Sequence, residues 1–484
     1  MARLDTRYVC GTCGATSLRW EGQCRSCANW NTMVESVVQS PRAMKQRSAA
    51  PVAAPQVTAL SDLDEADAER IVVGIREIDR VLGGGIVAGS LVLLGGEPGI
   101  GKSTLVLAVC GAVARTGGGT GRVLYASGEE SAAQLHMRAG RLGLAGHGAG
   151  EQIDVLPETS VERIVAAAEA TSPALLVIDS IQTLTTDVLD GPAGSVGQVR
   201  EAAARLQAYA KENGVPTVLV GHVTKDGTLA GPKTLEHIVD VVLTLEGERF
   251  SGLRLLRASK NRFGSTDEVG VFEMAPDGLQ EVADPGSAFI ETDSLGAPGV
   301  AVAATLEGSR PLLVEVQALV APQVHGSPRR TASGLDNQRL ALLIAVLGRR
   351  AGMNLASHDV YASVVGGLVV EEPAIDLPLV MALASALRDR PLIGGTVLCG
   401  EIGLTGELRP IHGLARRLRE AARLGFTRAI VPQQQGRREA IEDVPGIELV
   451  RVATLRDAIS AALSEPQQRA VRETVPIVIG ETTS

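Results

Sequence analysis

The chain has 484 residues, of which 45% are hydrophobic, 21% are charged and only 2% are aromatic. This length is too great for one core, so we expect two or three domains with cores built from aliphatic side chains. No apolar run approaches the roughly 18 residues that span a bilayer, and the N-terminus lacks the apolar segment of a signal peptide. These features argue against an integral membrane protein and predict a cytoplasmic location.

The net charge of −9 gives no support to nucleic-acid binding by itself. Its distribution is uneven, because residues 1–60 hold seven Arg or Lys and three Asp or Glu, a formal +4, which leaves −13 for the remainder. Any contact with DNA is therefore expected to be local, made by loops and by the N-terminal region.

Residues 1–36 contain two pairs of cysteines, ten residues apart, and each pair has two residues between its members: Cys10 and Cys13, Cys24 and Cys27. Four thiolates on two turns suit a tetrahedral zinc ion. A redox-active pair or disulfides are the alternative, which two close pairs in a cytoplasmic protein disfavour. Trp20 and Trp30 are expected to pack on the turns, because so small a module has little other core.

A linker over residues 37–60, rich in Pro, Ala, Ser and Gln, separates this module from an α/β region over residues 61–285. In that region short apolar runs mostly alternate with segments of helix length, which is the pattern of a mainly parallel sheet. The predicted strands are Leu91–Gly96, Val123–Ser127, Leu175–Asp179, Thr217–Val220, Val241–Leu245 and Leu253–Ala258.

The first of these strands leads into a phosphate-binding loop, which matches G-x-x-x-x-G-K-[ST] and precedes the predicted helix Thr104–Ala114. The loop and the start of the helix comprise Gly96, Glu97, Pro98, Gly99, Ile100, Gly101, Lys102, Ser103 and Thr104. The glycines let backbone N–H groups surround phosphate oxygens. Lys102 is expected to reach the β- and γ-phosphates of ATP, and Ser103 to bind Mg²⁺. The alternative is a Gly-rich turn that binds nothing.

Carboxylates follow two further strands. Asp179 ends the run Leu175–Asp179 and is expected to hold Mg²⁺ through water. Hydrolysis also requires a carboxylate that orients and deprotonates the attacking water. Glu129 is our first candidate for that role and Glu130 the second; the alternative is a solvated acidic pair that begins a helix.

Beyond residue 285 the sequence changes to strands punctuated by glycine and to amphipathic helices, including Asn337–Arg350 and Leu414–Leu424. We assign residues 286–463 to a second α/β domain and residues 464–484 to a tail. Cys110 and Cys399 lie in apolar segments and are expected in cores.

Taken together, these residues resemble the bacterial RadA (Sms) family of recombination and repair proteins over essentially the whole chain. The four-cysteine module carries the resemblance, together with four segments: Gly96–Thr104, Ser127–Ser131, Gly221–Asp240 and Lys260–Gly264. The last of these, KNRFG, is the signature of that family. The resemblance implies a RecA-like, hexameric, ATP-driven motor that acts in branch migration.

The resemblance also implies roles for individual residues. Lys260 and Arg262 would act across a subunit boundary on the neighbour's nucleotide, unless KNRFG is only an exposed basic turn. Residues 185–197 and 224–234 would be DNA-binding loops, in which Lys225 and Lys233 contact phosphates. His222 would either sense the γ-phosphate or be a hydrogen-bonded histidine at the end of a strand.

The second domain resembles the protease domain of Lon. Glu371–Ala382 is similar to the segment that carries the Lon serine, and Gly400–Leu418 to the segment that carries its lysine. In this chain Ala374 and Ala415 stand at those positions, and no lysine follows Lys260. Because a Ser–Lys dyad needs a hydroxyl and an amine, the domain is predicted to be inactive as a protease and to serve ring assembly and DNA contact.

The sequence therefore predicts a DNA-dependent ATPase motor for homologous recombination and DNA repair, with ATP, Mg²⁺ and Zn²⁺ as cofactors. Its expected partners are single-stranded and branched DNA, other copies of the chain in a homohexamer, and functionally the RecA recombinase. A KaiC-like or replicative-helicase-like ring ATPase with another substrate is the alternative, which KNRFG and the cysteine module disfavour. An ATP-dependent protease is a third possibility, disfavoured by the missing serine and lysine.

Overall fold

The computed structural model describes residues 5–10, 16–17, 19–30, 32–38, 70–116, 121–146, 148–222, 235–247, 252–291, 293–323, 326–433 and 444–463. Cys13, Lys225 and Lys233 lie outside these ranges, as do the predicted loop 224–234 and the tail. The chain divides into two compact units, one made of residues 1–73, 85–95 and 109–242, the other of residues 74–84, 96–108 and 243–484. Within the described ranges no helix is long and apolar enough to cross a bilayer.

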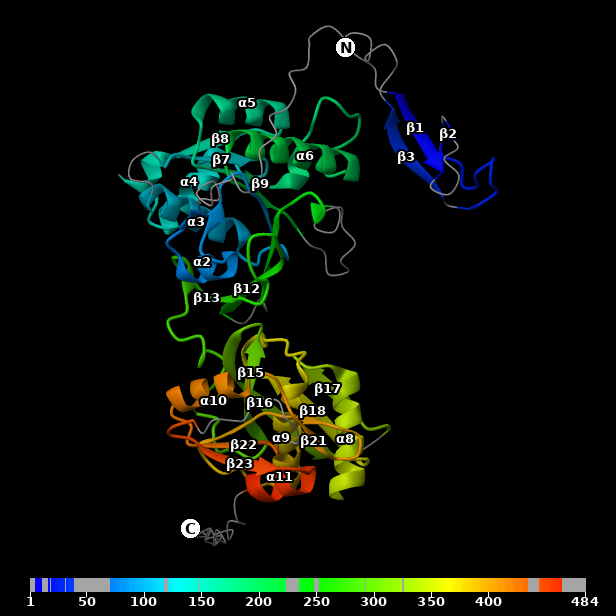
Figure 1. The fold of residues 1–484 in the computed structure, drawn as a ribbon, viewed down its shortest axis with the longest axis vertical. Coiled ribbons are helices and arrows are strands. Elements are labelled where there is room, and N and C mark those ends of the chain that lie inside the picture. The colour runs from blue at the N-terminus through cyan, green and yellow to red at the C-terminus, as the bar shows by residue number, and fades with distance from the viewer. Residues whose placement is uncertain are drawn as a thin grey trace, which may run out of the picture. The chain divides into compact units, whose positions relative to one another are not determined.

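The cysteine module is a small antiparallel sheet (Figure 1) of strands β1 (Asp5–Cys10), β2 (Thr16–Ser17) and β3 (Met33–Val38), in the order β2-β1-β3. Cys10, at the end of β1, pairs in register with Met33 at the start of β3. The second cysteine pair lies in the segment that joins β2 to β3. Cys10 and the segment that carries Cys24 and Cys27 therefore meet the sheet at the same end, where β3 begins.

A larger sheet of nine described strands forms the centre of the predicted ATPase region. In sheet order these are β14 (Gly278–Glu281), β13 (Val269–Ala275), β12 (Leu253–Asn261), β11 (Val241–Glu246), β6 (Leu91–Gly96), β10 (Thr217–Val220), β9 (Leu175–Asp179), β7 (Val123–Ser127) and β8 (Ile153–Pro157). Neighbours from β6 to β8 pair in parallel, whereas β12, β13 and β14 pair antiparallel. The predicted mainly parallel sheet is thus present.

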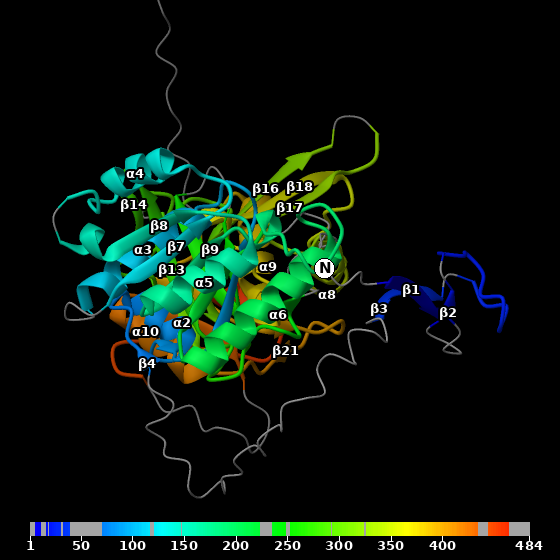
Figure 2. The same ribbon diagram turned by 90° about the horizontal axis from the view of Figure 1, so that it is seen from above.

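Four of the predicted strands have the predicted bounds, and two run further, to Glu246 and to Asn261. Helices α5 (Val161–Thr171) and α6 (Val196–Asn213) cover one face of the sheet (Figure 2), where they pack on alternate residues of β7 and β9. Alternate residues on the opposite face are buried as well, as in parallel sheets covered on both sides.

The other described helices of this region are α2 (Arg76–Leu82), α3 (Lys102–Thr116) and α4 (Ala132–Arg141). The short antiparallel pair β4 (Arg70–Ile71) and β5 (Ile86–Val87) lies on either side of α2 in sequence. Ser131 begins α4 with a capping box, in which its side chain accepts from Gln134 N and the Gln134 side chain accepts from Ser131 N.

The C-terminal ends of the parallel strands align in one row. Leu94 pairs with Val220, Val220 with Asp179, and Asp179 with Ser127. β6 ends at Gly96, two residues after Leu94, and the phosphate-binding loop begins there. Glu129 lies two residues after Ser127. The carboxyl edge of a parallel sheet is where ligands bind in α/β proteins, so the register gathers the predicted carboxylates at that edge.

A sheet of seven described strands forms the second α/β region. Its order is β17 (Arg330–Ser333), β18 (His358–Val364), β16 (Arg310–Pro322), β15 (Val300–Glu307), β19 (Thr396–Leu398), β22 (Arg428–Pro432) and β23 (Glu448–Val452). On one face pack α8 (Asn337–Ala351), α9 (Asp376–Arg388) and α11 (Leu455–Ala462), and on the other α10 (Leu414–Arg423). The pair β20 (Glu401–Ile402) and β21 (Leu408–Arg409) is separate.

Candidate nucleotide site and zinc module

Lys102 lies inside the phosphate-binding loop. It begins α3, is 4% exposed, and its Nζ donates to the carbonyl oxygens of Gly96 and Glu97 at 2.9 Å each. A buried ammonium needs polar partners, and the loop carbonyls supply them. A phosphate oxygen would be a stronger partner than a neutral carbonyl, because the hydrogen bond would then join two charges.

The shape of the loop depends on glycine and on a buried arginine. Gly99 and Gly101 have φ values of 79° and 115°, and a Cβ at Gly101 would lie 2.8 Å from Met274 Cε. Arg254, in β12, donates through Nε to the carbonyl oxygen of Ile100 at 3.1 Å, and burial lowers the pKa of Arg254. The loop is therefore held by its own backbone conformation and by a side chain from a distant strand.

Asp179 ends β9 and is 5% exposed. The hydroxyl of Tyr125, in β7, donates to its Oδ2 at 2.5 Å. Burial raises the pKa of Tyr125 far above its usual range, and the charge of Asp179 adds to the effect, so the phenol remains a donor. This bond fixes the plane of the Asp179 carboxylate at the edge of the sheet.

Glu129 lies beside the ends of two further strands. Its Oε1 accepts from the hydroxyl of Ser180, the residue after Asp179, and lies 3.1 Å from Nε2 of His222, two residues after β10. The Glu129 side chain is 41% exposed. The structure thus places a solvent-accessible carboxylate between β9 and β10, in contact with His222.

Glu130 has a different environment from its neighbour. Its Oε1 forms an ion pair with Arg138 of α4, and its backbone N–H donates to Ser127 Oγ at 3.0 Å. Because Arg138 lies on the helix that follows, this ion pair joins the end of β7 to α4. Glu130 is held by local structure, and Glu129 is the more accessible of the two carboxylates.

The predicted DNA-binding loop 185–197 is organised around Gln198, which is 2% exposed. Its Oε1 accepts from Thr186 N at 2.7 Å, and its Nε2 donates to the carbonyl of Leu189 at 2.7 Å. The loop ends where α6 begins, at Val196. The second predicted loop, 224–234, with Lys225 and Lys233, lies outside the described residues.

KNRFG forms the turn between β12 and β13. Lys260 and Asn261 end β12, and Asn261 Oδ1 accepts from Phe263 N at 2.9 Å, which closes the turn. Arg262 is exposed at the tip. A Cβ at Gly264 would lie 3.2 Å from Asn261 Nδ2, so the last glycine fits closely under the turn.

In the cysteine module, Cys24 and Cys27 share one tight turn. Ala28 N donates to the carbonyl of Cys24 at 2.8 Å, Cys24 N donates to that of Asn29 at 2.9 Å, and Ala28 has a φ of 58°. Cys24 is buried, and it packs with Met33, the register partner of Cys10. A turn that presents two thiols beside the strand end bearing Cys10 fits a tetrahedral zinc ion.

The two tryptophans of the module do not belong to its core. Trp20 is 57% exposed and Trp30 is 69% exposed, so the prediction that they pack on the cysteine turns was wrong. Cys24 and Met33, with Tyr8 and Cys27 partly buried against them, form the described core instead. The aromatic ring that packs against this core is therefore that of Tyr8 and not that of a tryptophan.

In the second α/β region, the segments similar to the serine and lysine segments of Lon meet each other. Gly400 N donates to the carbonyl of Ala374 at 3.0 Å. Ala374 is buried in a 3-10 helix (Pro373–Ile375) before α9, and Ala415 lies in the first turn of α10. Neither alanine offers a nucleophile or a base.

An ion pair flanks these two alanines. Arg417, 2% exposed, donates through both terminal nitrogens to the two carboxylate oxygens of Glu372 at 2.7 Å. Arg417 also donates to the carbonyl of Ala304 at 2.7 Å and to that of His412 at 3.0 Å. A charge pair with satisfied hydrogen bonds therefore joins the two segments.

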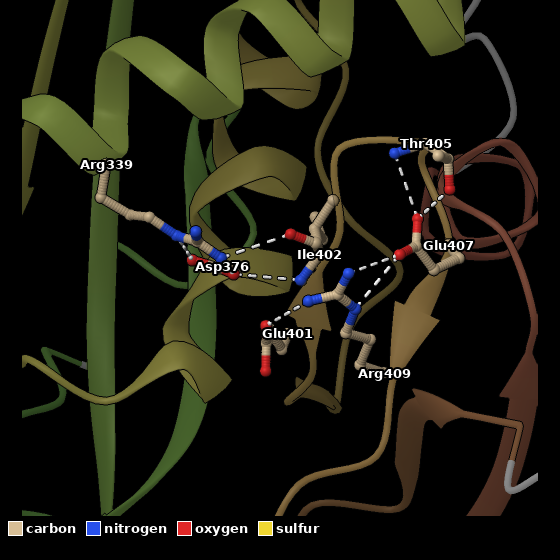
Figure 3. A network of polar contacts seen from close by, with 7 residues as sticks. All are labelled: Arg339, Asp376, Glu401, Ile402, Thr405, Glu407 and Arg409. Carbon is tan, nitrogen blue, oxygen red and sulfur yellow. Dashed lines mark hydrogen bonds and ion pairs between the residues drawn. The ribbon is translucent and has the colours of Figure 1, made fainter.

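A second polar network joins α8 and α9 to the β20–β21 pair (Figure 3). Asp376, buried at the start of α9, accepts from Arg339 Nε at 2.8 Å and from Ile402 N at 3.0 Å. Burial raises the pKa of Asp376, an effect that Arg339 opposes. Further along the same hairpin, the hydroxyl of Thr405 lowers the pKa of Glu407 to about 2.

Comparison with known proteins assigns a family to this architecture. Three family models match the chain: a rubredoxin metal binding domain over residues 8–35, an AAA domain over residues 54–228, and the C-terminal proteolytic domain of Lon protease (S16) over residues 352–465. The chain is 44% identical to the DNA repair protein RadA of Bacillus subtilis over 96% of its own length and 100% of that protein. It is 46% identical to that of Pseudomonas aeruginosa, over 95% and 99%. The chain belongs to the RadA family.

The family matches confirm the predicted order of a metal-binding cysteine module, an ATPase domain and a Lon-like domain, and they support ATP and zinc as cofactors. Two solved structures are also similar, the RadB recombinase and a KaiC-like protein of Pyrococcus horikoshii. They share 21% and 24% identity with the chain, cover 44% of it and 99% of their own length, and have TM-scores of 0.35 and 0.37.

Three residues that no motif indicated form hydrogen bonds with the candidate nucleotide-binding residues of this RadA-family chain. Tyr125 bonds to Asp179, Ser180 bonds to Glu129, and Arg254 bonds to the phosphate-binding loop. Ser180 directly follows the predicted carboxylate, which is a signal that the sequence offers. Tyr125 lies in an apolar run and Arg254 in a distant strand, so only the packed sheet shows their partners.

Proposed function

We propose that this chain is a DNA-dependent ATPase that promotes branch migration of recombination intermediates. The observation that supports it best is the row of strand ends, which contains Asp179. The phosphate-binding loop follows the row at the end of β6, and Glu129 follows it at the end of β7. The similarity to DNA repair proteins supports the choice of DNA as the effector. The chain would then comprise a cysteine module over residues 1–36, a linker over 37–60, an ATPase domain over 61–285, a Lon-like domain over 286–463 and a tail over 464–484.

In this mechanism Lys102 neutralises charge on the β- and γ-phosphates of the substrate ATP. The Ser103 hydroxyl would bind Mg²⁺ directly, and the Asp179 carboxylate, oriented by Tyr125, would hold it through water. Bound Mg²⁺ would offset charge that develops on the transferred phosphoryl group. Glu129 accepts the proton of the attacking water, while Ser180 and His222 keep its carboxylate oriented.

The chain acts as a homohexamer in the cytoplasm, in functional association with the RecA recombinase. Lys260 and Arg262 act across the subunit boundary on a neighbour's nucleotide. Lys225, Lys233 and the loop 185–197 contact the phosphates of single-stranded and branched DNA, which gives position without sequence specificity.

The Lon-like domain is a scaffold for the ring and for DNA contact in this proposal. Ala374 and Ala415 are where the serine and lysine of a protease would be, and the Glu372–Arg417 pair joins their segments. We therefore expect purified protein with ATP to leave casein intact, as measured by gel electrophoresis. ATP-dependent degradation that disappears on mutation of this domain would contradict the scaffold assignment.

The proposed function is tested by ATP hydrolysis with and without single-stranded DNA. We expect DNA to stimulate hydrolysis, and Lys102→Ala to lower the stimulated rate by about a hundredfold or more, because an uncompensated phosphate charge destabilises the transition state. Arg115→Ala is a matched control, since Arg115 is an exposed cation in the last turn of the same helix, α3. A rate that DNA leaves unchanged would favour a ring ATPase with another effector.

A further inference from the structure

The two tryptophans of the chain expose their rings at one place on the cysteine module. The sequence contains no tryptophan besides Trp20 and Trp30, and both lie between β2 and β3. They are 57% and 69% exposed. Tryptophan is among the most buried residue types on average, so two rings that stay in solvent in so small a module call for a function.

The rings lie against the same glycine. A Cβ at Gly22 would be 3.7 Å from Trp20 Cη2 and 3.7 Å from Trp30 Cζ3, so these two ring atoms are no more than twice that distance apart. Because Gly22 has no side chain, nothing from that residue separates the rings. The two side chains form one aromatic surface, which we call the tryptophan pair.

The cysteine turn positions the backbone of one member of the tryptophan pair, Trp30. Trp30 forms an antiparallel β-bridge with Gln23, the residue before Cys24, and Gln23 Nε2 donates to the carbonyl of Ala28 at 2.8 Å. The hydrogen bonds that hold Cys24 and Cys27 on one turn therefore also set the position of Trp30. A preorganised aromatic surface loses little conformational entropy when it binds a flat partner.

Charge indicates which flat partner the surface fits. Arg19 directly precedes Trp20 and Arg25 lies in the cysteine turn; both are exposed, and Arg25 pairs with Glu21. In sequence, residues 37–60 contain three basic residues, Arg42, Lys45 and Arg47, and no acidic residue, whereas the chain as a whole carries −9. Exposed aromatic rings beside basic side chains are the combination that binds single strands, because the bases stack on the rings and the phosphates meet the cations.

We propose that Trp20 and Trp30 form a stacking platform for unpaired bases of single-stranded DNA. The platform gives the zinc module a direct role in holding DNA, in addition to any contact made by the loops of the ATPase domain. This inference rests on the proposed function, since it takes DNA as the ligand of the chain. It predicts binding that depends on bases and not only on phosphates.

Intrinsic fluorescence tests the platform directly, because all the tryptophan emission of the full-length protein comes from these two residues. The probes are an oligothymidylate and an abasic oligonucleotide of the same length, which has the phosphates without the bases. We expect the oligothymidylate to quench the emission with saturation and the abasic strand to leave it nearly unchanged. Equal quenching by both strands would overturn the stacking platform.

Substitutions give a second readout, the affinity of the full-length protein for a labelled oligothymidylate. Trp20→Ala and Trp30→Ala should each raise Kd by about fivefold to a hundredfold, the range found for the loss of one stacked base. Trp30→Phe should restore most of the affinity, because phenylalanine keeps an aromatic face. Val34→Ala is the matched control, since Val34 is a 63% exposed apolar residue of the same module. Zinc content should equal that of the unsubstituted protein in every variant.

The outcomes separate this inference from the proposed function. DNA-stimulated ATP hydrolysis with no base-dependent quenching and unchanged Kd in the alanine variants would refute the platform and leave the proposed function standing. That result would assign the tryptophan pair to a protein partner, for which tryptophan is also a preferred contact residue. The absence of both DNA binding and DNA stimulation would refute the platform and the proposed function together.

Discussion

Glu129 and Glu130 are adjacent in the chain, yet their carboxylates have different partners. Glu129 is in contact with Ser180 and His222, and Glu130 is paired with Arg138. We expect Glu129→Gln to lower ATP turnover by about a hundredfold or more while ATP still binds, because the amide cannot accept a proton from water. Glu130→Gln should keep most of the turnover. Steady-state hydrolysis and nucleotide binding, measured on both variants, check this.

The two substitutions control for each other, since each removes one negative charge and keeps the shape of the side chain. If Glu130→Gln lost turnover and Glu129→Gln did not, the roles of the two residues would be reversed. A loss in neither would mean that the water is activated by a group other than these two carboxylates.

For individual residues, sequence analysis could predict the positions of those that belong to motifs. It missed residues whose role depends on how the strands pack. Lys102 and Asp179 could be predicted because their spacing and their place after strands are characteristic. Tyr125 could not, because a hydroxyl in an apolar run acquires its role only when β7 lies beside β9. The exposure of Trp20 and Trp30 was missed because the size of the module suggested that its largest rings would be buried.

Among the elements, α10 is tied to the segment before α9 by the pair between Arg417 and Glu372. Arg417→Ala should destabilise the Lon-like domain by about 3–5 kcal/mol, because Glu372 would keep a largely buried charge without its partner. Thermal unfolding followed by circular dichroism should show a lower midpoint for the transition of this domain.

Arg416→Ala is the control for that prediction. Arg416 is exposed on the same helix, and surface substitutions of this kind change stability by about 0.5 kcal/mol or less. Equal midpoints for the two variants would show that the buried pair adds nothing to stability. A double substitution of Arg417 and Glu372 by leucine should cost less than Arg417→Ala, since no unpaired charge remains.

Buried elements were easier to predict than edge elements. β6, β7, β9 and β10 were predicted with their bounds because their residues are buried on both faces and form continuous apolar runs. β8 was missed, since it is the edge strand and all its residues are partly or fully exposed. Its sequence carries Asp154 among apolar residues, so it lacks the signal of a buried strand.

For the whole molecule, the order of the three modules followed from motifs and from the change of pattern after residue 285. The family matches to residues 8–35, 54–228 and 352–465 identify the same three modules. The arrangement of several chains in an assembly could not be predicted in this way, because a motif within one chain does not show where a neighbouring subunit lies. Lys260 and Arg262 connect the two levels, since their proposed role requires a second subunit.

If Lys260 and Arg262 act across a subunit boundary, substituting them should leave the chain's own nucleotide binding intact. We expect Lys260→Ala and Arg262→Ala to keep ATP affinity and to lose DNA-stimulated hydrolysis and branch migration. The physical reason is that a cation supplied by the neighbour matters mainly once the transition state forms. Nucleotide binding by fluorescence titration, set against stimulated hydrolysis, separates the two effects.

Mixing experiments decide whether the cations act within a chain or across a boundary. Arg262→Ala subunits keep an intact phosphate-binding loop and Lys102→Ala subunits keep an intact KNRFG turn, so a mixed ring contains boundaries with both. With random exchange at equal amounts, about a quarter of the boundaries in a cyclic ring are complete, and the recovered hydrolysis should peak at that ratio. If labelled subunits exchange and no hydrolysis returns at any ratio, Arg262 acts on its own chain's nucleotide or only shapes the turn. Recovery that peaks at equal amounts requires a cation from the neighbour, because neither variant contains a complete site alone.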